Sequence, residues 1–133
     1  MRTTPLPPLA AAISFIDCIN RCDLDGLVNL MTNDHRLHIL DEPPLSGRDA
    51  NREAWNGYMT SFPQYIIYPE RCAWNGATVG VLGRTTGSHL GLPDDQELAL
   101  PVIWSAEVID GKLKSWSVLE DTPDARAHLG LAG

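Results

Sequence analysis

Apolar residues recur at helical spacing in the first quarter of the chain. From residue 9 to residue 19 they fall three or four positions apart, which is the spacing of one face of an α-helix. The same spacing over residues 24–31 predicts a second helix, and Asp23 stands where an N-cap is expected. Prolines interrupt residues 1–8, and we interpret this segment as a flexible lead into the first helix and not as a signal peptide.

A short strand and a third helix follow. Residues 35–40 are the strand candidate. Ser46, with Asp49 three residues later, resembles the capping box that begins a helix, and an apolar stripe then continues until Pro63 ends it. The Asn-Gly pair at residues 56–57 is typical of a turn, but the helical stripe on both sides of it favours a helix.

From residue 65 onward the pattern is that of β-strands. Runs rich in β-branched and aromatic residues predict four strands, at residues 65–72, 77–86, 97–109 and 112–119. Asn75-Gly76 and Asp110-Gly111 join them in pairs, and such dipeptides favour type I′ turns, in which both central residues have positive φ. Successive hairpins predict an antiparallel meander, with residues 87–95 as a long loop at its rim. Helices first and strands afterwards indicate an α+β fold.

Length and charge narrow the class of protein. A chain of 133 residues with a hydrophobic fraction of 44% is expected to form one domain with its own core. Its net charge of -7 argues against nucleic acid or an anionic membrane surface as a partner, because both need clustered Lys and Arg. Three cysteines, with Cys18 and Cys22 one helical turn apart, predict free thiols in a cytoplasmic protein, and their simplest interpretation is as small buried apolar groups.

No standard catalytic motif is present. The sequence contains no phosphate-binding Gly loop, no GxSxG, no HExxH and no paired CxxC. The spacing of His35 and His38 resembles that of two metal ligands. On a strand, however, side chains three residues apart lie on opposite faces of the sheet. We therefore predict neither a metal site nor a cofactor.

Several short motifs resemble one family. They are Trp55 and Tyr58 before Phe62-Pro63-Gln64-Tyr65, then Gly87-Ser88-His89, then Trp116 with Asp121 five residues later. In this order, after the predicted helices, they resemble the SnoaL-like polyketide cyclase branch of the nuclear transport factor 2-like superfamily. The resemblance implies a cystatin-like cone, in which three N-terminal helices pack on the concave face of a strongly curved, mostly antiparallel sheet. It also implies a single domain over residues 1–133, one deep pocket and a homodimer through the sheet.

Two known activities of related proteins are excluded. In ketosteroid isomerases, polar catalytic groups stand at the positions that correspond to Phe15, Ile39 and Trp104 here. In limonene epoxide hydrolases, the residues that hold and activate water correspond to Leu37, Ile39 and Val118. All of these positions are apolar in this chain, so neither catalytic apparatus is present.

Strand alternation predicts which side chains face the pocket. Because side chains two residues apart share a face, Asp41 accompanies Ile39. Glu120 accompanies Val118 for the same reason. On a third strand Gly83 has no side chain, which leaves room for a flat ligand. The predicted ligand-binding residues are Trp55, Tyr58, Ile39, Gly83, Thr85, Trp104, Trp116 and Val118, with a place in the core as the equal alternative for the aromatic ones.

Three side chains are candidates for acid/base chemistry. Glu120, if turned inward, would be desolvated and protonated near neutral pH. Asp41 and His89 have plainer alternatives, as a solvated turn acid and as a rim residue bonded to its own loop, and Asp121 is expected to cap a strand end or to pair with Arg126. We predict a protein that binds a hydrophobic, cyclic small molecule, acting as a cofactor-free cyclase, isomerase or dehydratase through Glu120, Asp41 or His89. The alternative is a binding or interaction module without catalysis.

Overall fold

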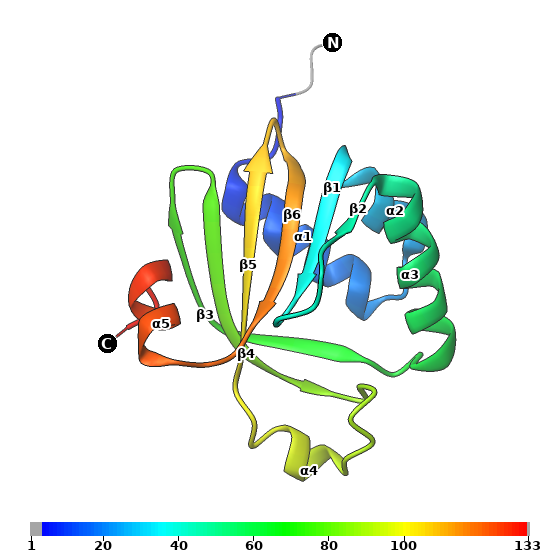
Figure 1. The fold of residues 1–133 in the computed structure, drawn as a ribbon, viewed down its shortest axis with the longest axis vertical. Coiled ribbons are helices and arrows are strands. Elements are labelled where there is room, and N and C mark those ends of the chain that lie inside the picture. The colour runs from blue at the N-terminus through cyan, green and yellow to red at the C-terminus, as the bar shows by residue number, and fades with distance from the viewer. Residues whose placement is uncertain (1–3, 133) are drawn as a thin grey trace.

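A six-stranded sheet with helices on both of its faces forms the fold (Figure 1). The structure is a computed structural model, and it describes residues 4–132. The helices are α1 (Pro8–Asn20), α2 (Leu24–Asn29), α3 (Arg48–Ser61), α4 (Asp94–Glu97) and α5 (Pro123–Leu129). The strands are β1 (Met31–Ile39), β2 (Leu45–Ser46), β3 (Ile66–Asn75), β4 (Thr78–Thr86), β5 (Val102–Ile109) and β6 (Lys112–Leu119).

The sheet is mixed, with strand order β2-β1-β6-β5-β4-β3. Neighbouring strands are antiparallel except β1 and β6, which run parallel. This confirms the predicted α+β fold with a curved, mostly antiparallel sheet. Because α3, α4 and four further strands separate β1 from β6 along the chain, no tight turn has to join them, and a parallel pair can form.

The first helices cover the concave face of the sheet. α1 packs across β3, β4, β5 and β6, and Figure 1 shows it passing behind β5 and β6. α3 lies against β1 and β2, and α2 packs between α1 and α3. Ala11 and Ala12 of α1 are fully buried, and their small side chains let the helix lie close to the strands. The core is therefore the space between α1 and the sheet.

The two predicted helix starts differ in their outcome. Asp23 is the N-cap of α2, as predicted, and its side chain accepts a hydrogen bond from the Gly26 amide at 3.0 Å. The capping box at Ser46 is wrong, because Ser46 belongs to β2 and Gly47 precedes α3 without a side-chain cap. Gly47 has a φ of 100°, a conformation that a residue with a Cβ rarely adopts. The turn into α3 therefore depends on glycine.

One of the two predicted hairpin turns is shifted by a residue. The Asp110-Gly111 pair has φ values of 51° and 78°, which confirms the type I′ turn. At the other hairpin, Asn75 still belongs to its strand and pairs with Thr78. The turn is therefore Gly76 and the alanine after it, and only Gly76 has a positive φ, of 59°. That is the pattern of a type II′ turn, in which glycine takes the first central position.

The strand predicted from residue 97 begins later than expected. Residues 94–97 form α4, and β5 begins only at Val102. Pro93 stands directly before a turn rich in acidic residues, and that combination favours the start of a helix. The predicted loop over residues 87–95 therefore ends in a helical turn, and this turn carries Glu97 into a buried position.

The segment before α1 is only partly described. Residues 1–3 of the predicted flexible lead lie outside the described residues, and Pro8 already belongs to α1. Between them, the chain passes close to the β5–β6 turn, since a Cβ on Gly111 would lie 2.8 Å from the Leu6 amide nitrogen.

α5 covers part of the opposite, convex face of the sheet. A Cβ on Gly80 would lie 2.7 Å from the Cβ of Leu129, so this glycine allows α5 to approach β4 closely. Ile103 is fully buried, although it lies on the face of the sheet opposite to that of Trp104. Leu131 is fully buried as well. Neither belongs to the main core cluster between α1 and the sheet.

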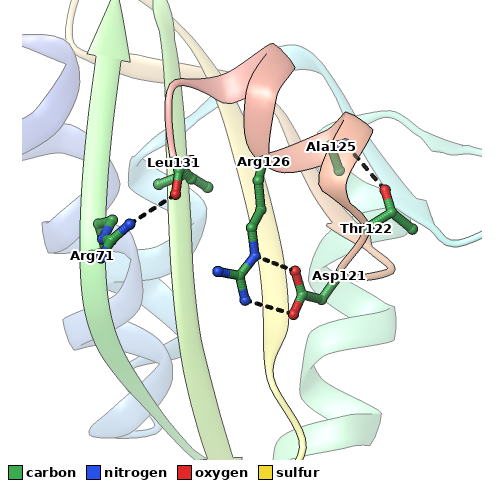
Figure 2. A network of polar contacts seen from close by, with 6 residues as sticks. All are labelled: Arg71, Asp121, Thr122, Ala125, Arg126 and Leu131. Atoms are coloured by element: carbon green, nitrogen blue, oxygen red, sulfur yellow. Dashed lines mark hydrogen bonds and ion pairs between the residues drawn. The ribbon is translucent and has the colours of Figure 1, made fainter. Parts of the chain in front are cut away.

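Polar contacts hold α5 in place (Figure 2). Arg126 donates two hydrogen bonds to the carboxylate of Asp121, at 2.6 and 2.8 Å, which confirms the predicted pair. Thr122 is the N-cap, and its hydroxyl oxygen accepts a hydrogen bond from the Ala125 amide at 3.1 Å. Arg71 of β3 donates to the Leu131 carbonyl at 3.0 Å, so the C-terminal segment is bonded to the edge of the sheet.

Candidate functional site

An aromatic row on α3 begins at the rim of the cone. The ring centroids of Phe62 and Tyr58 are 4.8 Å apart, and those of Tyr58 and Trp55 are 6.2 Å apart. Tyr65 meets Tyr58 edge to face at 5.1 Å. Phe62 and Tyr58 are half-buried, whereas Trp55 is only 8% exposed. The row therefore leads from the surface into the core.

The same series of ring contacts continues to the centre of the molecule. Trp55 meets Phe15 of α1 edge to face, with centroids 6.3 Å apart. Phe15 contacts Trp116 at 5.0 Å, and Trp116 stacks on Trp104 at 6.4 Å. We call the six rings of this series the aromatic wall: Phe62, Tyr58, Trp55, Phe15, Trp116 and Trp104.

Packing closes the inner end of the aromatic wall. Trp104 and Trp116 are each 1% exposed, and the predicted open space between them and Gly83 is wrong. A Cβ on Gly83 would collide with the carbonyl oxygen of Tyr68, because β3 has a bulge beside it. Gly83 therefore makes room for the backbone of β3 and not for a ligand.

Apolar surface is exposed where β1 and β6 end. Ile39 and Val118 are neighbours across these two strands. Ile39 is 36% exposed and Val118 is half-buried, although Trp116, on the same face of β6 as Val118, is buried. In Figure 1, β1 and α3 both end towards the lower part of the view. We call this end of the sheet, where β1 and β6 stop beside Ile39 and Val118, the mouth.

His89 lies at the outer end of the aromatic wall. Its Nδ1 is 2.9 Å from the hydroxyl oxygen of Tyr58, and its backbone N–H donates to the same oxygen at 3.2 Å. The imidazole itself is exposed and contacts the ring of Phe62 edge to face at 6.2 Å. Burial raises the pKa of Tyr58, so its hydroxyl stays protonated at neutral pH. The pair can hold or relay a proton at the rim.

A buried carboxylate supports the loop that carries His89. Glu97 is 1% exposed and accepts hydrogen bonds from the Thr85 hydroxyl and, at 3.3 Å, from the Ser88 amide. Burial is the main cause that raises the pKa of Tyr65 well above its usual range, and the neighbouring acidic groups of Tyr58 and Glu97 act in the same direction. Thr85, predicted to bind ligand, therefore uses its hydroxyl to hold Glu97.

The two predicted acids at strand ends lie in solvent. Asp41 is exposed in the turn after β1, where the Glu42 amide donates to the Ile39 carbonyl at 2.9 Å. Glu120 is exposed directly beyond the end of β6, so its predicted inward, desolvated position is wrong. The strand ends at Leu119, and alternation places no side chain beyond the last residue of a strand.

His35 is a buried group that the sequence argument considered only as a metal ligand. It is fully buried on β1, and its Nδ1 lies 2.7 Å from the carbonyl oxygen of Leu113. Burial lowers the pKa of His35 below its usual value, against the opposing effects of that hydrogen bond and of Asp34. Counting back from Ile39 in steps of two reaches Leu37 and then His35, so strand alternation contained the signal.

Asn51 ties α3 to the sheet. It is fully buried, and its Nδ2 lies within hydrogen-bonding distance of three carbonyl oxygens, those of His35, Leu45 and Gly47, at 3.2, 3.1 and 2.8 Å. Asn51 and Trp55 are four residues apart, so they share one face of α3. They are the two buried residues of this helix of 14 residues.

Sequence comparison places the chain in a family. Residues 12–116 match the family model described as the SnoaL-like domain. The chain belongs to the SnoaL-like domain family. The resemblance predicted from the motifs is thus confirmed, and the aromatic wall lies almost wholly on elements within the matched range.

Solved structures share the fold of this SnoaL-like domain. A cystatin-fold protein from Novosphingobium aromaticivorans is 19% identical, with a TM-score of 0.70 over 85% of this chain and 97% of its own. A provisionally named polyketide cyclase from Sinorhizobium meliloti is also 19% identical, with a TM-score of 0.69 over 85% and 94%. TerC, co-crystallised with polyporic acid, is 18% identical, with a TM-score of 0.71 over 93% and 98%. No match is found among curated proteins.

Two further features of the SnoaL-like domain concern ions and membranes. Among residues 4–132, no group of three or more His, Cys, Asp or Glu side chains is placed to hold a metal ion. Within the same part of the chain, no helix has the length and apolar character needed to cross a membrane.

Proposed function

We propose that this SnoaL-like domain binds one hydrophobic, cyclic small molecule at the mouth of the cone, against the aromatic wall. The observation that carries the proposal is the unbroken series of ring contacts from half-buried Phe62 to buried Trp104. Flat aromatic surfaces favour stacking with a flat ring, and ligand sites are lined mostly by such groups with a few polar ones.

The chemistry of the rim supports a catalytic form of this proposal. As a cofactor-free cyclase, isomerase or dehydratase, the domain would need a group that moves a proton near the ligand. Among the candidates His89, Asp41 and Glu120, His89 is the best supported, because it bonds to Tyr58 of the aromatic wall. Asp41 and Glu120 lie in solvent beyond the ends of their strands. The Sinorhizobium meliloti relative and TerC, which was crystallised with polyporic acid, support a cyclic ligand.

A binding module without catalysis is the second candidate. It is favoured by the apolar residues that stand where ketosteroid isomerases and limonene epoxide hydrolases carry their catalytic groups. It is also favoured by the tight packing of Phe15 against Trp116 at the inner end of the wall. The two candidates differ in one measurable respect, since only an enzyme loses turnover when His89 becomes Gln.

A fluorescence titration tests ligand binding directly. In a Trp74→Phe background, which removes the 60% exposed tryptophan outside the wall, naphthalene should quench tryptophan emission in a saturable way. Phe62→Ala should weaken this binding at least several-fold. Tyr68→Ala, which removes a 43% exposed aromatic ring elsewhere on the surface, is the matched control and should leave it unchanged. Equal quenching in all three proteins, or none, would contradict the proposal.

The resemblance to the family also supports a homodimer through the sheet. α5 covers the convex face over β3, β4 and β5. A dimer through this face would therefore be formed by the outer surface of β1 and β6 and by α5 itself. Sedimentation analysis would give the mass in solution, and a monomer at all concentrations would contradict this assembly. We also propose a cytoplasmic setting, supported by the free thiols of Cys18, Cys22 and Cys72.

A further inference from the structure

Three buried polar atoms lack a hydrogen-bond partner among residues 4–132. They are Nε2 of His35, Nε1 of Trp55 and Oδ1 of Asn51. A buried polar group without a hydrogen bond destabilises the fold, so native proteins keep few of them without a reason. Three such atoms on facing elements call for a common explanation.

The three atoms belong to one region at the inner part of the aromatic wall. The rings of His35 and Trp55 both contact Phe15, with centroid distances of 5.9 and 6.3 Å. Asn51 lies one helical turn before Trp55 on α3, and its Nδ2 donates to the backbone carbonyl of His35 at 3.2 Å. His35 of β1 and Trp55 of α3 thus contact the same phenylalanine ring, and Asn51 joins the two elements.

The hydrogen-bonding role of each atom follows from its surroundings. The Leu113 carbonyl can only accept, so the Nδ1 of His35 carries the proton of their hydrogen bond. Burial lowers the pKa of His35, so the ring is neutral at neutral pH and its Nε2 is an acceptor. The Nε1 of Trp55 can only donate. The site therefore offers one acceptor and one donor, on two rings that both contact Phe15.

We propose that His35 Nε2 and Trp55 Nε1 form a polar subsite for a hydroxyl group on the ring of the bound molecule. This inference rests on the proposed function and names the class of ligand: a hydroxylated aromatic or enolic ring. The hydroxyl donates to His35 and accepts from Trp55, so both atoms are satisfied. A carbonyl group would leave His35 unpaired, and a carboxylate would face the lone pairs of His35 and of the Asn51 carbonyl oxygen.

The arrangement of α3 allows a ligand to reach this subsite. Asn51 and Trp55 are the two buried residues of α3, whereas Tyr58 and Met59 are only partly buried against the core, so the C-terminal half of the helix offers the approach from solvent. Trp55 remains 8% exposed and stands between half-buried Tyr58 and Phe15 in the series of ring contacts. Entry of a ring beside Trp55 brings its hydroxyl within the region of both polar atoms.

A pair of probes that differ by one hydroxyl group tests the subsite. Binding of 2-naphthol and of naphthalene is measured for the unchanged chain and for His35→Asn, Trp55→Phe and His38→Asn. In His35→Asn, the asparagine Nδ2 can replace the donor to Leu113, but the Nε2 acceptor is lost. His38 is on the same strand and faces the other side, so His38→Asn is the matched control.

We expect 2-naphthol to bind the unchanged chain about five- to tenfold more tightly than naphthalene, which is the usual worth of a buried hydrogen bond. The ratio of the two affinities should fall towards one in His35→Asn and in Trp55→Phe, and should persist in His38→Asn. Using the ratio corrects for any loss of apolar contact that the substitutions cause.

Equal affinities for the two probes in the unchanged chain would overturn the subsite while leaving the proposed function standing, and the polar atoms would then be satisfied by an internal water. A preference that survives in both His35→Asn and Trp55→Phe would overturn it as well. If neither probe binds, the proposed function and the subsite both fail. If His35→Asn does not fold, the affinity ratio in Trp55→Phe still tests the subsite. The ¹⁵N resonance of His35 Nε2 in the unchanged chain is a further test. That resonance should shift with 2-naphthol and not with naphthalene.

Discussion

The Nδ1 of His35 lies 2.7 Å from the carbonyl oxygen of Leu113, a residue 78 positions later in the chain. The bond crosses from β1 to β6, where the register of this parallel pair shifts between Met31 and Arg36. It fixes the ring of His35 in one orientation and one tautomer. The first prediction follows from this contact.

The stability of the protein should fall as the pH drops below about 6.5, the ordinary pKa of histidine. Burial lowers the pKa of His35 in the folded state, so below pH 6.5 the unfolded chain binds more protons than the folded one. The contribution of His35 is fully present above the unfolded pKa and is lost on acidification, by up to about 1.4 kcal/mol per pH unit. Urea unfolding at several pH values between 5 and 8 measures this slope. His35→Asn should flatten it, and an unchanged slope in that variant would contradict the assignment.

Gly83→Ala and Gly57→Ala should change stability in opposite directions. A methyl group on Gly83 collides with the Tyr68 carbonyl, so the substitution should cost about 1–3 kcal/mol. Gly57 lies within α3 with no atom within 4 Å of the position of an added Cβ, so alanine there should stabilise by about 0.5–1 kcal/mol. Chemical denaturation measures both. A neutral Gly83→Ala would mean that β3 has room beside it after all.

Thr85→Val should destabilise the fold by about 1–3 kcal/mol, because it removes the hydroxyl that donates to the buried carboxylate of Glu97. The shape of the side chain is almost unchanged. Thr78→Val, at a half-buried position on the same strand, is the control and should have little effect. If the two variants unfold at the same denaturant concentration, Glu97 does not depend on Thr85.

Leu131→Ala should cost about 2–5 kcal/mol, since Leu131, in the segment that follows α5, is fully buried. Leu90, which is 52% exposed, provides the control, and Leu90→Ala should change stability by less than about 0.5 kcal/mol. Thermal melting separates the two. A mild effect of Leu131→Ala would show that α5 adds little to the sheet.

Features with local chemistry could be predicted from the sequence. Asp23 caps a helix through atoms three residues away, and Asp110-Gly111 forms a turn whose geometry depends on those two residues alone. The helices over the concave face followed from helical spacing. The predicted position of the turn between β3 and β4 was wrong by one residue. Gly76 is in the turn whether Asn75 belongs to the turn or, as observed, to β3, so the glycine alone does not fix the register.

Features that depend on distant contacts were missed. The parallel pairing of β1 and β6, the bond from His35 to Leu113, and the bond from Thr85 to buried Glu97 all join residues of different elements. Glu120 was placed inward by alternation, but the strand stopped one residue earlier. The family resemblance predicted Trp55 and Tyr58 as part of the aromatic wall. Phe15 was not predicted to bind ligand and was noted as the residue that stands where ketosteroid isomerases have a catalytic tyrosine.

The indole N–H signals of the four tryptophans test ligand binding at the aromatic wall most directly. Trp55, Trp104 and Trp116 belong to the wall, and Trp74 is 60% exposed elsewhere, so each spectrum carries its own control. On titration with 2-naphthol, the account predicts a saturable shift of the Trp55 signal, a smaller one for Trp116, and none for Trp74. A shift confined to Trp74, or no shift in any of the four signals, would contradict it.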